Sequence, residues 1–276
     1  MNRRLLVLSA LSLGSAVAAP TPLTVTATAS GYRAPATVAA GAVTVTFKNS
    51  GKIPVDLAFF RLKPGVTDAQ FQAAATAVAT QSAKDASWKL NQMVEVAGGV
   101  GDVPPGQSGA ATITLVPGKY LLASLDADEK THKTALSMGF LKTITVTGSA
   151  MGSAPAADYK INMVDYRFEL PTNATAGRHT WQVMNSGKEP HFALVAKLMP
   201  GKTLKDAMAA LMSQSQSGPP PMDFEHAVFA QVLTTGHAET VTWNLSKGSY
   251  VVVCFVATKD GTEHARMGML QQLDVK

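Results

Sequence analysis

The sequence predicts an all-β protein with small helical insertions, built as two tandem Greek-key β-sandwich domains. The first observation is the length, because 276 residues are roughly twice the size of a common globular domain. The second is a series of short alternating or β-branched segments bounded by Gly, Pro, Asn and Ser, which are typical of strands in a sandwich. The third is an internal repeat, which divides these segments into two similar sets.

The repeat is clearest in the early part of each set. Residues 41–55 and residues 177–191 share a Gly, the run Asn-Ser-Gly-Lys and a Pro at an offset of 136. The motif Leu-x-Pro-Gly-x-Thr then occurs at 62–67 and again at 198–203, with the same offset. Motifs at a fixed offset indicate a repeated structural unit.

Two domains of similar size follow from the repeat. We predict the first domain at 20–148 and the second at 158–276. The segment 149–157 between them consists of small residues with Pro and Gly, which is typical of a linker.

Each predicted domain combines strands with one helical insertion. The strands expected in the first domain are 23–29, 42–48, 55–62, 111–116, 120–124 and 141–147. Those expected in the second domain are 160–164, 179–184, 192–198, 240–245, 249–254 and 270–275. Alanine-rich stretches with helical spacing at 68–83 and 204–213 predict the helices, and the second insertion extends over about 199–225.

The N-terminal segment 1–19 has the features of a secretory signal peptide. Arg3 and Arg4 precede a short apolar stretch, and Ala16-Val-Ala18 provides a small-residue cleavage signal. The apolar stretch is far shorter than the roughly 20 residues that span a bilayer, and no later segment is long enough either. We therefore expect an exported protein, periplasmic or extracellular, with no membrane span in the mature chain.

Composition and motifs exclude several functions. A single cysteine rules out an intramolecular disulfide, an all-cysteine zinc site and an iron–sulfur cluster. The net charge of +5 comes from scattered Lys and Arg residues, so we expect no nucleic-acid partner. The sequence also lacks the nucleophile, metalloprotease and phosphate-loop motifs of common enzymes, and we predict a protein that is not an enzyme.

Four residues of the second domain form a candidate metal site: His191, Cys254, His264 and Met269. Two imidazoles and a thiolate form a trigonal plane that suits copper, and a weak thioether suits the axial position. His191 begins a predicted strand, Cys254 ends another, and the last two residues precede the final strand. Strand ends of a sandwich can meet at one pole, so we predict that these four residues bind copper.

The same residues carry a family resemblance. The segment Asn185-Ser-Gly-Lys-Glu-Pro-His191 looks like the plastocyanin-type Asn-x4-Pro-His element, and His264-x4-Met269 has the matching spacing. The second domain thus resembles the cupredoxin, or type 1 blue copper, family. It departs from that pattern in the 199–225 insertion and in the long Cys254-to-His264 gap, which is similar to the loop of copper nitrite reductases.

The resemblance implies single-electron transfer through a type 1 copper site, with a redox partner that the sequence does not identify. The first domain has Val55, Ser124 and Phe140 at the positions of His191, Cys254 and Met269, and only a lone His132 near the fourth. We therefore expect a cupredoxin-like domain without metal there, which serves as a packing or docking partner.

Several alternatives stay open. Cys254 could be a small buried hydrophobic residue in a metal-free binding or scaffold protein, and copper storage or delivery is a further possibility. Met267 competes with Met269 for the axial position, and His226 and His237 are weaker candidate ligands. The sequence leaves the oligomeric state open. A copper-loading patch could be formed by Met199, Met208, Met212 and Met222. The i, i+4 spacing of Met208 and Met212 is more simply a helix face packed on the sandwich.

Overall fold

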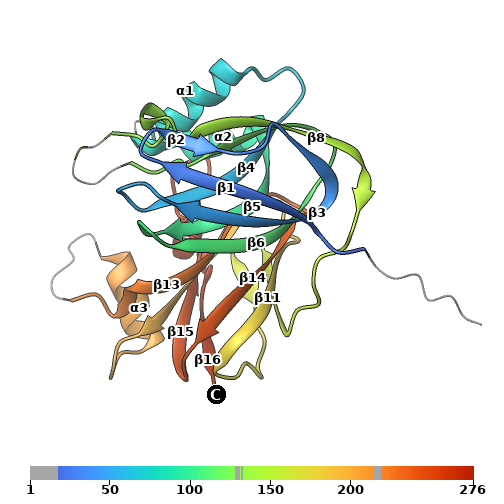
Figure 1. Ribbon diagram of the computed structural model, residues 1–276. Helices are drawn as coiled ribbons and strands as arrows, with labels where there is room; N and C mark the ends of the chain where they lie inside the picture. The colour runs from blue at the N-terminus through green and yellow to red at the C-terminus, as the bar shows by residue number, and fades with distance from the viewer. Residues whose placement is uncertain (1–17, 82, 128–130, 132, 214–218) are drawn as a thin grey trace, which may run out of the picture.

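The computed structural model describes residues 18–81, 83–127, 131, 133–213 and 219–276 (Figure 1). The features predicted for residues 1–17, including most of the signal peptide, lie outside this range, as does His132. We call residues 18–151 the first half and residues 152–276 the second half. No helix in the described ranges is long and apolar enough to cross a membrane.

The protein is all-β with helical insertions, as predicted. The strands of the first half are β1 (Thr21–Thr28), β2 (Gly31–Arg33), β3 (Thr37–Asn49), β4 (Val55–Leu62), β5 (Val94–Val103), β6 (Ser108–Leu115), β7 (Gly118–Ala123) and β8 (Leu141–Met151). Those of the second half are β9 (Tyr159–Val164), β10 (Arg167–Glu169), β11 (Gly177–Asn185), β12 (His191–Leu198), β13 (Met222–Leu233), β14 (Ala238–Leu245), β15 (Gly248–Val253) and β16 (Leu270–Val275).

Both halves pair their strands in two layers. In the second half, β10-β9-β11-β14 forms one layer and β13-β12-β15-β16 the other, with a parallel pair only between β9 and β11. In the first half, β2, β1, β3 and β6 form one layer and β8, β7, β4 and β5 the other, with β1 parallel to β3. β8 also pairs with β3, which joins the two layers along one side.

Helices follow the repeated Leu-x-Pro-Gly-x-Thr motif in both halves. The Thr of the motif caps a helix each time: Thr67 begins α1 (Asp68–Ala79) and Thr203 begins α3 (Leu204–Met212). Each hydroxyl accepts a bond from the third residue of its helix, whose side chain bonds back to the capping residue, so the motif specifies a helix start. A further helix, α2 (Ala86–Met93), was not predicted and leads directly into β5.

Four strands were not predicted from the sequence: β2 and β10, which have three residues each, and the longer β5 and β13. β5 has Gly98 and Gly99 in its middle, and glycine weakens a strand pattern. β13 begins at Met222, inside the segment 199–225 that was predicted as a helical and proline-rich insertion. That insertion is therefore shorter than predicted, and β5 and β13 lie where the two halves meet.

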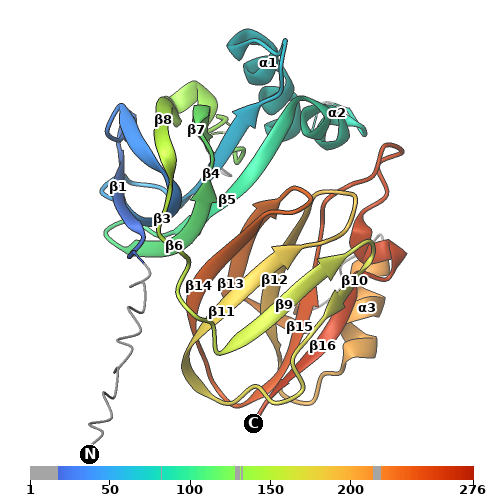
Figure 2. The same ribbon diagram turned by 90° about the vertical axis from the view of Figure 1, so that its right-hand side faces the viewer.

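Strand pairing continues from one half into the other. β14 pairs antiparallel with β6, and β13 pairs with β5 at Leu233 and Ala97, so one sheet path runs through both halves (Figures 1 and 2). β8 extends to Met151, three residues into the predicted linker 149–157. A Cβ on Gly41, which has a φ of 113°, would lie 1.9 Å from the Met151 carbonyl oxygen, so this close approach requires glycine. The division into domains at 149–157 stays a prediction.

The core explains why the second half can hold a polar centre. Its interior is filled by Trp181, which packs against Tyr159 and Trp243 with ring centroids 4.7 and 5.5 Å away. These large rings leave one end of the sandwich, where β12 begins and β15 ends, for smaller polar side chains. In the first half, Tyr32 and Phe140 pack edge to face near the corresponding end, so an aromatic pair fills space there.

Candidate metal centre

The centre is assembled from three loops at one end of the second sandwich. His191 is the first residue of β12, Cys254 directly follows β15, and His264 begins the short 3-10 helix η2 (His264–Met267). Each residue thus lies where a strand or turn fixes its backbone. The three side chains are fully buried, each with 0% exposure.

A buried asparagine holds the first of these loops in shape. The Asn185 Nδ2 atom donates to the carbonyl oxygens of Glu189 and Leu233, each at 2.7 Å, and Oδ1 accepts from the Gly187 N–H at 2.8 Å. Asn49 makes the same three kinds of bond in the first half, to Ile53, Val103 and Gly51. The repeated Asn-Ser-Gly motif therefore specifies a loop shape rather than a ligand.

The three buried side chains point their donor atoms at one another. The Nδ1 atoms of His191 and His264 are 2.9 Å apart, and the Cys254 sulfur lies 4.0 Å from the first and 3.7 Å from the second. In the described part of the chain, these residues form the one group of three or more His, Cys, Asp and Glu side chains that could hold a metal ion. The point equidistant from the three atoms is about 2.1 Å from each, close to the ~2.0–2.3 Å of metal bonds to imidazole and thiolate.

The outer nitrogen of each ring contacts a carboxylate. His191 Nε2 lies 3.2 Å from Asp165 Oδ1, and His264 Nε2 lies 2.9 Å from Glu189 Oε2. An ionised carboxylate only accepts hydrogen bonds, so each Nε2 atom carries the proton and each Nδ1 atom is left with a lone pair. This is the arrangement in which metal-bound histidines are oriented by carboxylates.

The main reason to infer a cation at this position is that the two Nδ1 atoms lie 2.9 Å apart and their lone pairs face each other. Both Nδ1 atoms are buried, and both hydrogen-bond donors of the rings are directed to Asp165 and Glu189. Neutral rings in this state repel each other unless a proton or a metal ion lies between them. The residues present therefore fit copper by donor type and by geometry.

Burial controls the protonation of all three side chains. Desolvation lowers the pKa of His191 to about 4, against the opposing effect of Asp165, and it lowers the pKa of His264 as well. Desolvation also raises the pKa of the Cys254 thiol to about 12, although backbone N–H groups of Phe192 and Val256 act in the other direction. The imidazoles are thus neutral near pH 7, as metal ligation requires, while the thiol has to lose a proton.

The two candidate axial methionines lie in different environments. Met269 is fully buried, its N–H donates to the His264 carbonyl at 3.0 Å, and its carbonyl accepts from the Cys254 N–H at 3.2 Å. Met267 is 42% exposed. Gly268 between them has a φ of 109°, which reverses the chain and sends the two side chains apart.

Sequence reasoning missed the residues that surround the ligands. Asp165 and Tyr166 form the tip of the hairpin between β9 and β10, far along the chain from His191, and no spacing rule connects them. Tyr166 donates to Glu189 Oε1 at 3.0 Å, and its ring packs edge-on against His264 at 5.2 Å. Glu189 belongs to the Asn-x4-Pro-His segment and lies two residues before His191. This proximity in the sequence was the one signal that could have identified Glu189 as a neighbour of the metal ligands.

The corresponding positions of the first half lack metal-binding chemistry. Val55, Ser124 and Phe140 are all buried there. His226 is exposed and bonds to Asp223, while His237 lies in the turn between β13 and β14. Neither histidine belongs to the group formed by the three buried side chains.

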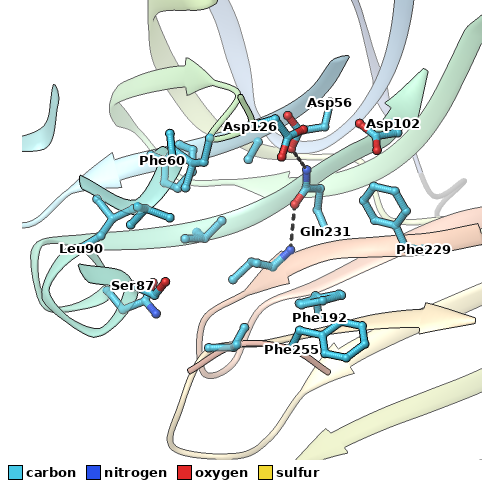
Figure 3. Close-up of a pocket in the computed structure, with 18 of the residues that line it drawn as sticks. Asp56, Phe60, Ser87, Leu90, Asp102, Asp126, Phe192, Phe229, Gln231 and Phe255 are labelled. Atoms are coloured by element: carbon cyan, nitrogen blue, oxygen red, sulfur yellow. Dashed lines mark hydrogen bonds between the residues drawn. The ribbon is translucent and has the colours of Figure 1, made fainter. Parts of the chain in front are cut away.

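A pocket of about 600 Å³ lies between the two halves, next to this centre (Figure 3). Phe192 and Phe255, which directly follow His191 and Cys254 in the chain, line it from the second half. Asp56 lies across the pocket in the first half and accepts a hydrogen bond from Gln231 Nε2.

Three aspartates line the pocket: Asp56, Asp102 and Asp126. Burial raises the pKa of Asp56 well above its ordinary value, and the nearby Asp126 raises it further. Burial and Asp126 also raise the pKa of Asp102 to about 6. Because no Lys or Arg is found among the described residues that line the pocket, these carboxyl groups are protonated more readily than exposed ones.

Comparisons with known proteins give only distant structural likeness. No protein-family model matches the chain, and no curated protein matches it in sequence. Auracyanin A, a "blue" copper protein from Chloroflexus aurantiacus, is 13% identical over 46% of this chain and 99% of its own, with a TM-score of 0.32. A dithionite-reduced auracyanin from Roseiflexus castenholzii is 21% identical over 42% of this chain and 94% of its own, with a TM-score of 0.28. A multicopper oxidase is 12% identical over 92% of this chain and 88% of its own, with a TM-score of 0.26. At TM-scores this low, such likeness assigns no function.

Proposed function

We propose that the protein binds one copper ion through His191, Cys254 and His264, with Met269 as the fourth ligand, and transfers single electrons. The observation that carries this proposal is the pair of buried Nδ1 lone pairs that face each other beside a buried thiol. Two imidazoles, one thiolate and a weak thioether are the donor set of blue copper electron-transfer sites. Met269 is preferred to Met267 because it is buried next to the centre.

The protein residues would perform two tasks around such an ion. Asp165 and Glu189 hold the outer nitrogens of the rings, which fixes the direction of both Nδ1 lone pairs. The Cys254 thiol gives up its proton on metal binding, and the backbone N–H groups of Phe192 and Val256 then face the thiolate. Bound copper would supply one-electron exchange. Donors that are fully buried and held by hydrogen bonds keep their positions, so little rearrangement would accompany the exchange.

Electron transfer is favoured over the other functions considered. An oxidase with several coppers needs several ligand clusters, whereas the described residues bring together one such group. In a metal-free scaffold, the two imidazole lone pairs that face each other would repel and would not stabilise the protein. As the sequence predicts export, we propose that the protein accepts and donates electrons outside the cytoplasm, with a redox partner still to be identified.

Copper titration of the purified protein tests this function. We expect an intense visible thiolate-to-copper band that saturates at one copper per chain and is absent in Cys254→Ser. Met267→Leu serves as the matched control for Met269→Leu, and only the second variant should shift the band. A colourless product with unchanged thermal stability would favour the metal-free scaffold. Saturation above one Cu(II) per chain would favour an oxidase, and ready loss of Cu(I) to a chelator would favour delivery.

A further inference from the structure

Methionines are exposed on the second half, around α3 and η2. Met208 is 46% exposed, Met212 is 50% exposed and Met267 is 42% exposed, and Met199 just before α3 is 41% exposed. The i, i+4 spacing predicts a helix face packed on the sandwich, and for Met208 and Met212 this prediction is wrong. Met222 is buried as a strand residue.

The packing of α3 explains why these methionines face outward. Its buried side is formed by Ala207, and Leu204 and Leu211 pack partly buried against the same apolar cluster. The helix therefore uses small and branched residues for its packing and presents Met208 and Met212 to solvent. These two are four residues apart on one helix, so their side chains are neighbours, with Cβ atoms roughly 6 Å apart.

α3 lies against the element that carries His264. Ala265 of η2 packs into the same cluster as Ala207 and Leu211, which places η2 beside the helix. Figure 2 shows α3 beside β16, the strand that η2 leads into. η2 has a buried candidate ligand at one end, His264, and an exposed thioether at the other, Met267.

The thioether group of methionine discriminates between metal ions. Thioethers are soft, uncharged ligands without a proton to lose, and they select Cu(I) over the harder divalent ions. Methionine side chains are also flexible enough to close around an ion. The buried centre is closed to solvent, since its histidines and its cysteine have 0% exposure, so an ion has to pass through the protein surface to reach it.

We propose that Met208, Met212 and Met267 form a surface site that captures Cu(I) and transfers it to the buried centre. Capture is independent of the proposed function, whereas transfer rests on it. The ion stays Cu(I) throughout: bonds to thioether sulfur break, a bond to the Cys254 sulfur forms, and the thiol proton passes to water.

The capture step is tested in the full-length Cys254→Ala protein, which lacks the buried thiolate. Anaerobic titration against a coloured Cu(I) chelator should show one retained Cu(I). Met208→Leu with Met212→Leu conserves side-chain volume and should weaken this binding by about tenfold or more. Met151→Leu is the matched control, because Met151 is 61% exposed but lies in the first half. No retained Cu(I), unchanged Cu(I) binding in the double methionine variant, or an equal loss in the control would overturn the proposal.

The transfer step is tested in the otherwise unmodified chain. Met208→Leu with Met212→Leu should slow the filling of the buried centre from a Cu(I) donor by about tenfold, while filling from Cu(II) keeps its rate. Equal rates of filling from the Cu(I) donor in this double variant and in the wild type would contradict transfer. If Cu(I) is captured at the surface but no visible band forms on oxidation, the electron-transfer function fails while the capture site stands.

Discussion

The Nε2 atom of His264 lies 2.9 Å from Oε2 of Glu189. The other oxygen of this carboxylate accepts a hydrogen bond from Tyr166 at 3.0 Å, and the Tyr166 ring packs against the imidazole. The carboxylate is thus held from a second side, and it fixes the tautomer and the direction of the ring. His264 sits on a long loop from Cys254. The loop holds the His264 backbone through its N–H, which donates to the Val256 carbonyl at 2.8 Å, and the contact with Glu189 holds the ring itself.

We expect Glu189→Ala to lower copper affinity by about 10- to 100-fold, the usual effect of removing a group that orients a ligand. Glu189→Gln should have an intermediate effect, since the amide oxygen can still accept from Nε2. Competition titration with a copper chelator measures both. Glu169→Gln is the control, because Glu169 is an exposed carboxylate on the nearby β10. Equal affinity in all variants would show that Glu189 does not orient the ring.

The paired asparagines allow loop stability and metal binding to be separated. Asn185 and Asn49 are buried and make equivalent bonds in the two halves. Substitution of either asparagine by Ala leaves two carbonyl groups without their donor. Each substitution should lower the free energy of unfolding by about 1–3 kcal/mol, as measured by denaturant unfolding. Only Asn185→Ala should also weaken copper binding, because only its loop leads into His191. A similar loss of copper in Asn49→Ala would contradict this separation.

The sequence was sufficient for features that depend on neighbours in the chain. The capping residues Thr67 and Thr203 lie within a few residues of the helices that they begin, and His191 and Cys254 lie at strand ends that alternation makes visible. The sequence was insufficient for features that depend on contacts between residues far apart in the chain. Asp165 reaches His191 across 26 residues, which no period connects. The spacing of Met208 and Met212 showed a shared helix face but not which face is buried.

The junction of the two halves depends on glycines in β5. A Cβ on Gly98 would lie 2.5 Å from Glu239 Oε2, and its φ of 98° favours glycine as well. Gly106 has a φ of 77° but no atom within 4 Å of the added carbon. Gly106→Ala should therefore lower the free energy of unfolding by about 1–2 kcal/mol, through backbone strain alone. Gly98→Ala should lower it clearly more, because the added carbon also meets Glu239. Equal losses in chemical unfolding would mean that the contact with Glu239 is easily relieved.

Glu239 links the two halves through its buried carboxyl group. It is 1% exposed, and its two oxygens accept from the backbone N–H groups of Gly99 at 2.9 Å and Gln231 at 2.7 Å. Gly99 belongs to the first half and Gln231 to the second. Desolvation raises the pKa of Glu239 to about 8, although both hydrogen bonds act to lower it.

The elevated pKa of Glu239 predicts how stability changes with pH. The folded state favours the protonated acid, so its contribution is complete below the unfolded pKa of about 4.3 and is lost as pH rises through about 8. Between these values, the free energy of unfolding should fall by up to about 1.4 kcal/mol per pH unit. Glu239→Gln cannot ionise and should remove this part of the slope, although it loses one backbone bond. Urea unfolding from pH 5 to 8 measures the slope, with the exposed Glu225→Gln as control. If both variants keep the wild-type slope, Glu239 is already ionised at pH 5.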